Sequence, residues 1–351
     1  MVLRTLAGIG LIAALAGCGS SPTAGERPAV VPEAITEGAQ ALRTLPDGWR
    51  WESYRDVVVA VPSEWIHYTS SSQQITQWCV ARGNQLRAPS VGRPGPSTAA
   101  GCTGDKVDGV SPGSLLKNGG AFVAFAAGAG QTLRTEGDRT VVVVGDVAVV
   151  IQAEEALREQ IAATVQQRDR ADHNGCSLTH PISADPGWRP DPFDPAVFTD
   201  VTSMTACRYD FLTHGNTPTP VGSTALVSSV RVTGERASRT AVAIAESPLG
   251  GGPDNASQCA VSAHYGDEAI VVRLERAVGG PVYLVVRFSG CNYNGIDDGT
   301  AVHRLTWESA GAFFEGPNSI SAFSGNAEKA KVLHPESAAG AHAKEKSLKG
   351  R

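Results

Sequence analysis

Hydrophobic and polar residues alternate in several short runs of this chain, which is the pattern of half-buried β-strands. In GWRWESYRDVVVAVP, residues 48–62, an alternating run and a Val-rich run flank residues 55–56, and the pattern predicts a hairpin with its turn there. A second hairpin is predicted in TVVVVGDVAVVIQ, residues 140–152, because Gly-Asp at 145–146 is a suitable two-residue turn. AFVAFA, residues 121–126, predicts a further strand.

A helical period occurs in three other segments. In AEEALREQIAATVQQRDR, residues 153–170, apolar side chains recur at every fourth position from Leu157 to Val165, with acids in the first turn and bases in the last. An amphipathic helix is therefore expected. ASRTAVAIAES, residues 237–247, predicts a second helix, and HRLTWESAGAFFEG, residues 303–316, a closing helix.

Five strand candidates lie in the second half of the chain. They are SMTACRYDF (203–211), TALVSSVRVTG (224–234), QCAVSAHY (258–265), EAIVVRLERA (268–277) and VYLVVRFSG (282–290). Short Gly-containing turns join the last three, which are therefore expected to form an antiparallel meander.

These elements predict an α+β fold with two disulfide-containing domains, each an antiparallel sheet with one or two helices. A length of 351 residues suits two domains, which we place at residues 45–170 and 171–316. Residues 18–44 are rich in Ser, Pro, Ala and Glu and predict a disordered tether. The polar segment 317–351 predicts a disordered tail, and residues 1–17 a cleaved signal peptide.

The signal-peptide prediction rests on an apolar run at residues 6–16 that follows a single arginine. The run is shorter than the ~20 apolar residues that a membrane-spanning helix needs. It ends in Leu-Ala-Gly-Cys18, which resembles the lipobox of bacterial lipoproteins. The resemblance implies cleavage before Cys18 and a diacylglycerol on its sulfur, so the chain would be held at the outer face of the cell membrane. The alternative is an ordinary secretory signal with a coincidental cysteine.

The cysteine count agrees with export. Of seven cysteines, six remain after Cys18, and disulfides persist outside the cytoplasm. Loop-closure entropy favours pairing of neighbours, which gives Cys79–Cys102, Cys176–Cys207 and Cys259–Cys291. The last pair conflicts with the meander, because first and third strands run parallel and place Cys259 and Cys291 at opposite ends. Either Cys259 precedes the first paired strand and folds back, or the C-terminal pairing differs.

Two catalytic-looking strings fail on physical grounds. G-x-S-x-G occurs at 109–113, but Pro112 follows the serine and has no N–H for an oxyanion hole. S-x-x-K occurs at 114–117 without the S-D-N and K-T-G elements that accompany it in penicillin-interactive enzymes. The eight histidines form no zinc motif, and no C-x-x-C occurs. The sequence therefore predicts no catalytic residues, no metal and no cofactor.

The loop SGCNYNGIDDGT, residues 289–300, carries the most oxygen-bearing side chains. Candidate ion ligands are Asn292, Asn294, Asp297 and Asp298. An EF-hand-type calcium loop needs an oxygen ligand at position 5 and a glutamate at position 12. Counted from Asn292, these positions hold Ile296 and His303. The alternative is a disulfide-pinned turn, since Asn and Asp bond their own backbone and tolerate positive φ.

Aromatic side chains suggest one more kind of site. Trp49, Trp51, Tyr54, Trp65, Tyr68 and Trp78 could line a face that binds sugar or peptide. The alternative is hairpin and core packing. His264 beside Tyr265 could be catalytic or a sensor, or simply a half-buried strand position.

Several segments resemble the uncharacterised exported proteins and lipoproteins of high-GC Gram-positive bacteria. They are GWRWESYRDVVVAVPSEW, VAVVIQAEEALREQIAATV and GDEAIVVRL with VRFSGCNYNGIDDGT, so the resemblance covers about residues 45–315. It implies export and architecture but no reaction. We expect a lipid-anchored protein that binds an envelope glycan or a partner protein. The alternatives are an envelope hydrolase with dispersed catalytic residues and a structural or sensory subunit of a neighbouring membrane protein. A net charge of −5 argues against nucleic acid as a partner.

Overall fold

The computed structural model describes residues 42–67, 89–93, 120–127, 135, 137–213, 217–255 and 259–319. Cys18, Cys79, Cys102, Tyr68 and Trp78 lie outside these ranges, as do the predicted signal peptide, most of the tether and all but the first residues of the tail. Among the described residues, no helix is long and apolar enough to cross a membrane.

The first half of the described chain contains two sheets. In the smaller one, strands β1 (Trp49–Tyr54), β2 (Val57–Pro62) and β8 (Gln166–Gln167) pair antiparallel in that order. The larger one has the order β3-β4-β5-β7-β6, with bounds Ile66–His67, Ser90–Gly92, Phe122–Ala127, Val147–Gln152 and Arg139–Val144. Both predicted hairpins are confirmed, with Arg55 and Gly145 at positive φ in their turns.

One detail of the larger sheet differs from the prediction. Strands β3, β4 and β5 pair parallel, so this sheet is mixed rather than purely antiparallel. Strands β2 and β7 are buried along their whole length, which explains why both read as continuous Val-rich runs. Their apolar core also receives Ile161 from helix α2 (Glu155–Ala162), which is shorter than the predicted helix.

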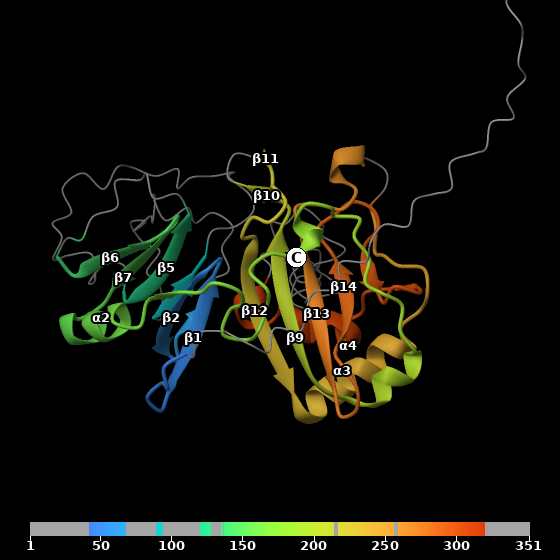
Figure 1. Ribbon diagram of the computed structural model, residues 1–351, viewed down its shortest axis with the longest axis horizontal. Coiled ribbons are helices and arrows are strands. Elements are labelled where there is room, and N and C mark those ends of the chain that lie inside the picture. Colours follow the sequence, from blue (N-terminus) through green and yellow to red (C-terminus); the bar gives the residue numbers. More distant parts are fainter. Residues whose placement is uncertain are drawn as a thin grey trace, which may run out of the picture. The chain divides into compact units, whose positions relative to one another are not determined.

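The second half forms one six-stranded antiparallel sheet (Figure 1). Its order is β12 (Leu226–Thr233), β9 (Val201–Asp210), β13 (Glu268–Arg276), β14 (Val282–Arg287), β15 (Gly295–Asp297) and β16 (Val302–His303). A further pair, β10 (Leu212–Thr213) with β11 (Thr217–Pro218), stands apart from it. The α+β class is confirmed; the division into domains at residues 170 and 171 stays a prediction.

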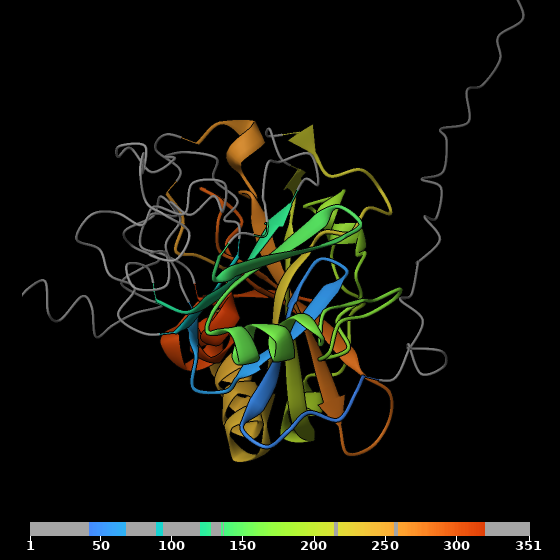
Figure 2. The same ribbon diagram turned by 90° about the vertical axis from the view of Figure 1, so that its left-hand side faces the viewer.

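The alternation of side chains along the strands explains the two faces of this sheet. Ile270, Val272 and Leu274 of β13 pack on one face with helix α3 (Gly234–Glu246). Figure 2 shows α3, in gold, on one side of the strands. Ala269 and Val271 lie on the other face, in a cluster with the two half-cystines of the Cys176–Cys207 bridge. The two-residue period of the sequence therefore decides which residues meet the helix.

Two predicted elements are wrong in detail. Residues 259–265 do not form the predicted strand: Val261–Ala263 form a 3₁₀ turn with exposed side chains, and Gly266 at positive φ separates it from β13. The closing helix α4 covers only Trp307–Ala310 and continues as 3₁₀ turns, Gly311–Phe314 and Gly316–Asn318. Glycine is a poor helix former, and Gly316 has positive φ, so a long helix does not extend through this segment.

The first of these corrections resolves the conflict over the last disulfide. Because residues 259–265 form no paired strand, Cys259 precedes β13 and folds back beside Cys291, at a Cα–Cα distance of 5.6 Å. Cys176 and Cys207 are bridged at the same Cα–Cα distance. Both neighbour pairings among the described cysteines are confirmed.

Candidate functional site

The segment with the predicted ion ligands, residues 289–300, follows β14, contains β15 and ends before β16. Asp297 of β15 accepts hydrogen bonds from Arg189 Nε and Nη2, both at 2.8 Å, and from Arg287 Nη1 at 3.2 Å. Burial would raise the pKa of Asp297, but the hydrogen bonds from Arg189 and the Gly299 N–H lower it below its usual value. Asp297 is therefore an ionised carboxylate already neutralised by cationic side chains.

Asp298 serves the turn that follows. Its Oδ1 accepts from the backbone N–H groups of Thr300 (2.8 Å) and Ala301 (2.6 Å), and its Oδ2 lies 3.1 Å from His303 Nε2. Asp297 and Asp298 thus bind different partners instead of presenting their oxygens to one point. Two acceptor sets of this kind stabilise a tight turn.

The two asparagines hold the start of the same loop. The Asn294 Nδ2 group donates to three oxygens, those of Gly290 (3.0 Å), Pro253 (3.1 Å) and Asp254 (2.6 Å). Asn292 Oδ1 accepts from the N–H of Tyr293 at 2.9 Å. Within the described ranges no group of three or more His, Cys, Asp or Glu side chains could hold a metal ion. The arrangement of all four candidates fits a disulfide-pinned turn.

This loop also builds an aromatic surface, which we call the aromatic shelf and define as His264, Tyr265 and Tyr293. The rings of Tyr265 and Tyr293 stack with centroids 4.9 Å apart and an interplanar angle of 21°. His264 meets Tyr293 edge-on at 5.5 Å, and the Arg287 guanidinium lies 5.4 Å from the centroid of Tyr265. Tyr293 remains 51% exposed.

The backbone beneath the shelf is closely constrained. Tyr293 has φ of 57°, a conformation that a bulky L-residue adopts only when its surroundings impose it. On one side the Cys259–Cys291 bridge holds the loop, and Asn292 N–H donates to the His264 carbonyl at 3.1 Å. A Cβ at Gly290 would lie 2.0 Å from that same carbonyl oxygen, so only glycine allows the two segments to approach.

The six aromatic residues proposed from the sequence as a binding face do not form one where the structure describes them. Tyr54 and Trp65 are 1% and 3% exposed in the first core, and Trp49 packs against it. Trp51 is half-buried on β1, and the remaining two lie outside the described residues. Core packing therefore accounts for Trp49, Tyr54 and Trp65. His264, which the sequence suggested as a possible catalytic or sensor residue, lies on the aromatic shelf.

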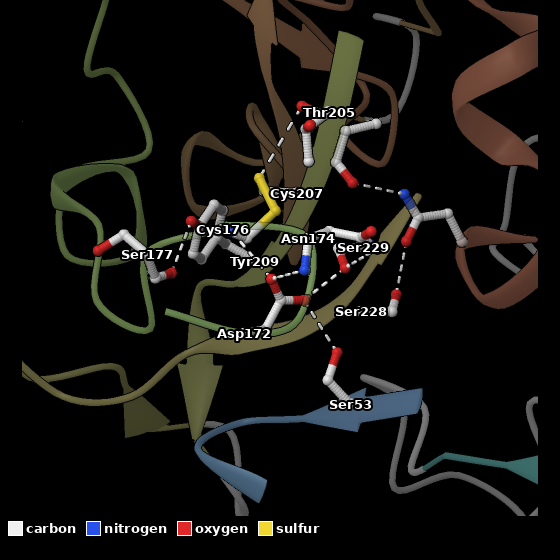
Figure 3. The surroundings of a disulfide bond; sticks show 12 residues. Ser53, Asp172, Asn174, Cys176, Ser177, Thr205, Cys207, Tyr209, Ser228 and Ser229 are labelled. Atoms are coloured by element: carbon white, nitrogen blue, oxygen red, sulfur yellow. Dashed lines mark hydrogen bonds between the residues drawn. A yellow bond between two sulfur atoms is a disulfide. The ribbon is translucent and has the colours of Figure 1, made fainter. Parts of the chain in front are cut away.

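A second cluster, around Asp172, was missed by sequence reasoning. The Asp172 carboxylate accepts hydrogen bonds from Ser53 Oγ of β1 at 3.0 Å and from Ser229 Oγ of β12 (Figure 3). It also accepts from the backbone N–H groups of Asn174 and Cys176, next to the Cys176–Cys207 bridge. The only local signal was the DHNGC string, because Asp followed by Asn-Gly is typical of such turns.

Neighbouring charged groups extend this cluster. Glu52, only 2% exposed, forms ion pairs with Arg50 and Arg93 and lies 2.7 Å from His67 Nε2. Burial would raise the pKa of Glu52, but the charge of Arg93 and the hydrogen bond from His67 hold it far below its usual value. His173 lies 3.7 Å from Asp172, and burial lowers its pKa.

The polarity of these contacts argues against a nucleophile. A catalytic serine must donate its hydroxyl proton to a base such as histidine. Here the hydroxyls of Ser53 and Ser229 both donate to Asp172, and His173 Nε2 lies 3.0 Å from the Asn174 amide nitrogen. Both serines are buried, at 0% and 2% exposure. The cluster therefore joins β1, β12 and the 172–176 turn as a structural unit.

One surface groove, of about 600 Å³, lies along the outer side of α3 beside Trp307. Two arginines that line it form ion pairs: Arg239 with Glu235 at 2.6 Å, and Arg236 with Glu315. The groove therefore combines these paired charges with the apolar side chains of Val242, Trp307 and Ala312.

Comparison of the chain with protein-family models, curated proteins and solved structures found no match. Candidate function therefore rests on the residues and contacts described above.

Proposed function

We propose that this protein is a lipoprotein held at the outer face of the cell membrane by a lipid on Cys18, and that it binds an envelope component. The lipobox-like Leu-Ala-Gly-Cys18 supports the anchor. Two disulfides among the described residues support an oxidising, extracytoplasmic environment.

The observation that carries the binding role is the aromatic shelf. In the buried cluster around Asp172, the hydroxyls of Ser53 and Ser229 donate to the carboxylate, so neither donates to a histidine. Tyr293, in contrast, is half exposed in a costly backbone conformation on a cross-linked loop. Strained residues of this kind occur preferentially at ligand-binding sites, where the surrounding structure is built to hold them. Binding through the shelf is therefore favoured over hydrolysis.

The anchor is tested by replacing Cys18 with Ala and fractionating the cells. We expect the variant to lose lipid labelling and to leave the membrane fraction, because two or three acyl chains provide most of the membrane affinity. Ser20→Ala, two residues further on, is the matched control and should remain in the membrane. Unchanged membrane retention of Cys18→Ala would refute the anchor.

The binding role is tested by site-specific photocrosslinking in intact cells. A photoreactive benzoylphenylalanine at Val261, which is 82% exposed next to the shelf, should crosslink an envelope component. The same residue at Val278, which is 76% exposed in the turn between β13 and β14, is the control and should not. Equal labelling from the two positions, or none from Val261, would count against the shelf as the binding surface.

A further inference from the structure

We propose, on the basis of the proposed binding role, that the aromatic shelf is a binding site for a neutral glycan, with a sugar ring packed on Tyr293. A pyranose or furanose ring presents an apolar face of C–H groups and a rim of hydroxyls. It is matched by a flat exposed ring with polar groups at its edge. Tyrosine provides such a surface at low entropic cost, since it has few rotatable bonds.

The shelf has both parts of this surface. Tyr293 is braced by stacking on Tyr265 and by the edge of His264, yet half of its own surface stays exposed. The Tyr293 phenol, the half-buried His264 ring and the half-buried Asn292 side chain provide hydrogen-bonding groups around it. Several donors and acceptors around one aromatic platform suit the hydroxyl rim of a sugar.

The platform is also ordered before any ligand arrives. The Cys259–Cys291 bridge, the three hydrogen bonds of Asn294 and the close approach at Gly290 hold Tyr293 in place. A ligand that binds there does not have to order the loop, and this favours weak, small ligands such as oligosaccharides.

The local charges favour a neutral glycan over an acidic one. Arg287, whose guanidinium lies beside Tyr265, and Arg189 both bind Asp297. Asp267 is exposed two residues beyond Tyr265, and Asp254 is exposed beside Asn294. A polyanionic sugar would therefore meet neutralised cations and uncompensated carboxylates.

The exposed apolar area favours a glycan over a protein. Among residues 259–267 and 288–298, Val261 and Tyr293 are the large hydrophobic side chains that are exposed. A stable protein interface covers about 800 Å² on each partner around a well-packed apolar centre. One tyrosine and one valine fit a sugar-sized contact better.

The test is calorimetric titration of the full-length protein, purified in a detergent without a sugar headgroup. The probes are tetrasaccharides of N-acetylglucosamine, mannose, arabinose and glucose, with a hyaluronan tetrasaccharide as the acidic comparison. We expect saturable binding of at least one neutral probe with a dissociation constant below about 1 mM. We expect weaker binding or none with hyaluronan.

Three variants link binding to the shelf. Tyr293→Gly removes the ring but suits the positive φ, so binding should fall about tenfold or more while the melting temperature is kept or raised. Tyr293→Trp keeps a flat ring and should bind within about threefold of the original chain. Tyr283→Ala, which removes a half-buried tyrosine from the far end of β14, is the matched control and should bind normally.

Absence of binding to every neutral probe would overturn the inference, and so would preferential binding of hyaluronan or normal binding by Tyr293→Gly. If Tyr293→Gly does not fold, Tyr293→Asn provides the same test, since asparagine also tolerates positive φ. A Val261 crosslink to a protein, with no neutral probe bound, would refute the glycan and leave the binding role standing. If the protein binds a glycan but the Cys18→Ala variant stays in the membrane fraction, the anchor is refuted and the glycan site is kept.

Discussion

At the scale of single residues, two carboxylates in this protein are held in opposite protonation states by their neighbours. Glu52 lies among Arg50, His67 and Arg93 and stays ionised. Asp210 lies directly across from Glu268 in the β9–β13 register, and its Oδ1 is buried without a hydrogen-bond partner. Burial, and then the charge of Glu268, raise the pKa of Asp210 to about 8, against the lowering effect of Arg208 and Arg55.

This difference predicts how stability depends on pH. The folded protein keeps a proton on Asp210 up to about pH 8, whereas the unfolded chain releases it near pH 3.8. Asp210 therefore contributes stability that is fully present below pH 3.8 and is lost as pH rises through 8. Asp210→Asn mimics the protonated form. The free energy of unfolding that it gains over the original chain should therefore be larger at pH 8 than at pH 5.

Urea unfolding at pH 5 and pH 8 measures this effect. Asp191→Asn, at an exposed position, is the matched control and should show the same pH dependence as the original chain. If the stability difference between Asp210→Asn and the original chain is the same at both pH values, Asp210 is not protonated in the folded protein.

At the scale of elements, the loop between β14 and β15 depends on close approach of two backbones. Gly290 passes the His264–Tyr265 segment so closely that a methyl group would lie 2.0 Å from the His264 carbonyl oxygen. Backbone atoms cannot move aside as a flexible side chain can, and the disulfide between Cys259 and Cys291 prevents the two segments from separating. Glycine is therefore required here by packing.

Gly290→Ala should lower the free energy of unfolding by roughly 1–3 kcal/mol, the range for forced overpacking. Gly280→Ala is the matched control, because a Cβ there meets nothing within 4 Å. Its free energy of unfolding should stay within about 0.5 kcal/mol of the original. Urea denaturation of both variants measures the difference, and equal stabilities would show that the loop can relax.

At the scale of the whole described chain, β1 and β12 belong to different sheets and meet at a small number of polar contacts. Arg55 N–H donates to the Leu226 carbonyl at 2.7 Å, and Ser53 and Ser229 donate to the same Asp172 carboxylate. Val227 of β12 packs in the apolar cluster of the first sheets. Asp172 is therefore a shared acceptor on which the meeting of the two strands depends.

Asp172→Ala should lower the free energy of unfolding by about 3 kcal/mol or more, because it leaves two buried hydroxyls and two backbone N–H groups without their acceptor. Hydrogen exchange should show the loss first in the amides of β1. Asp169→Ala removes an exposed acid three residues earlier and should change stability by less than about 0.5 kcal/mol. Similar effects of the two substitutions would contradict the joining role of Asp172.

Sequence patterns predicted what depends on neighbouring residues. The turns at residues 55–56 and 145–146, the alternation along β9, β13 and β14, and helix α3 follow from periodicity and turn chemistry within a few residues. The two described disulfides follow from loop-closure entropy, which favours the nearest cysteines. The lipid anchor on Cys18 also rests on a local motif and stays a prediction.

Only the tertiary structure decided which distant residues meet. Tyr293 is separated from Tyr265 by two strands of chain, and Ser53 from Asp172 by a whole sheet, so no periodicity relates them. The parallel pairing of β3, β4 and β5 is equally invisible to local patterns. Propensity and patterning act over a few positions, whereas a site depends on how strands far apart in the chain are packed. Asn292, Asn294, Asp297 and Asp298 share one loop in the sequence, but only the tertiary structure shows which partners their side chains bind.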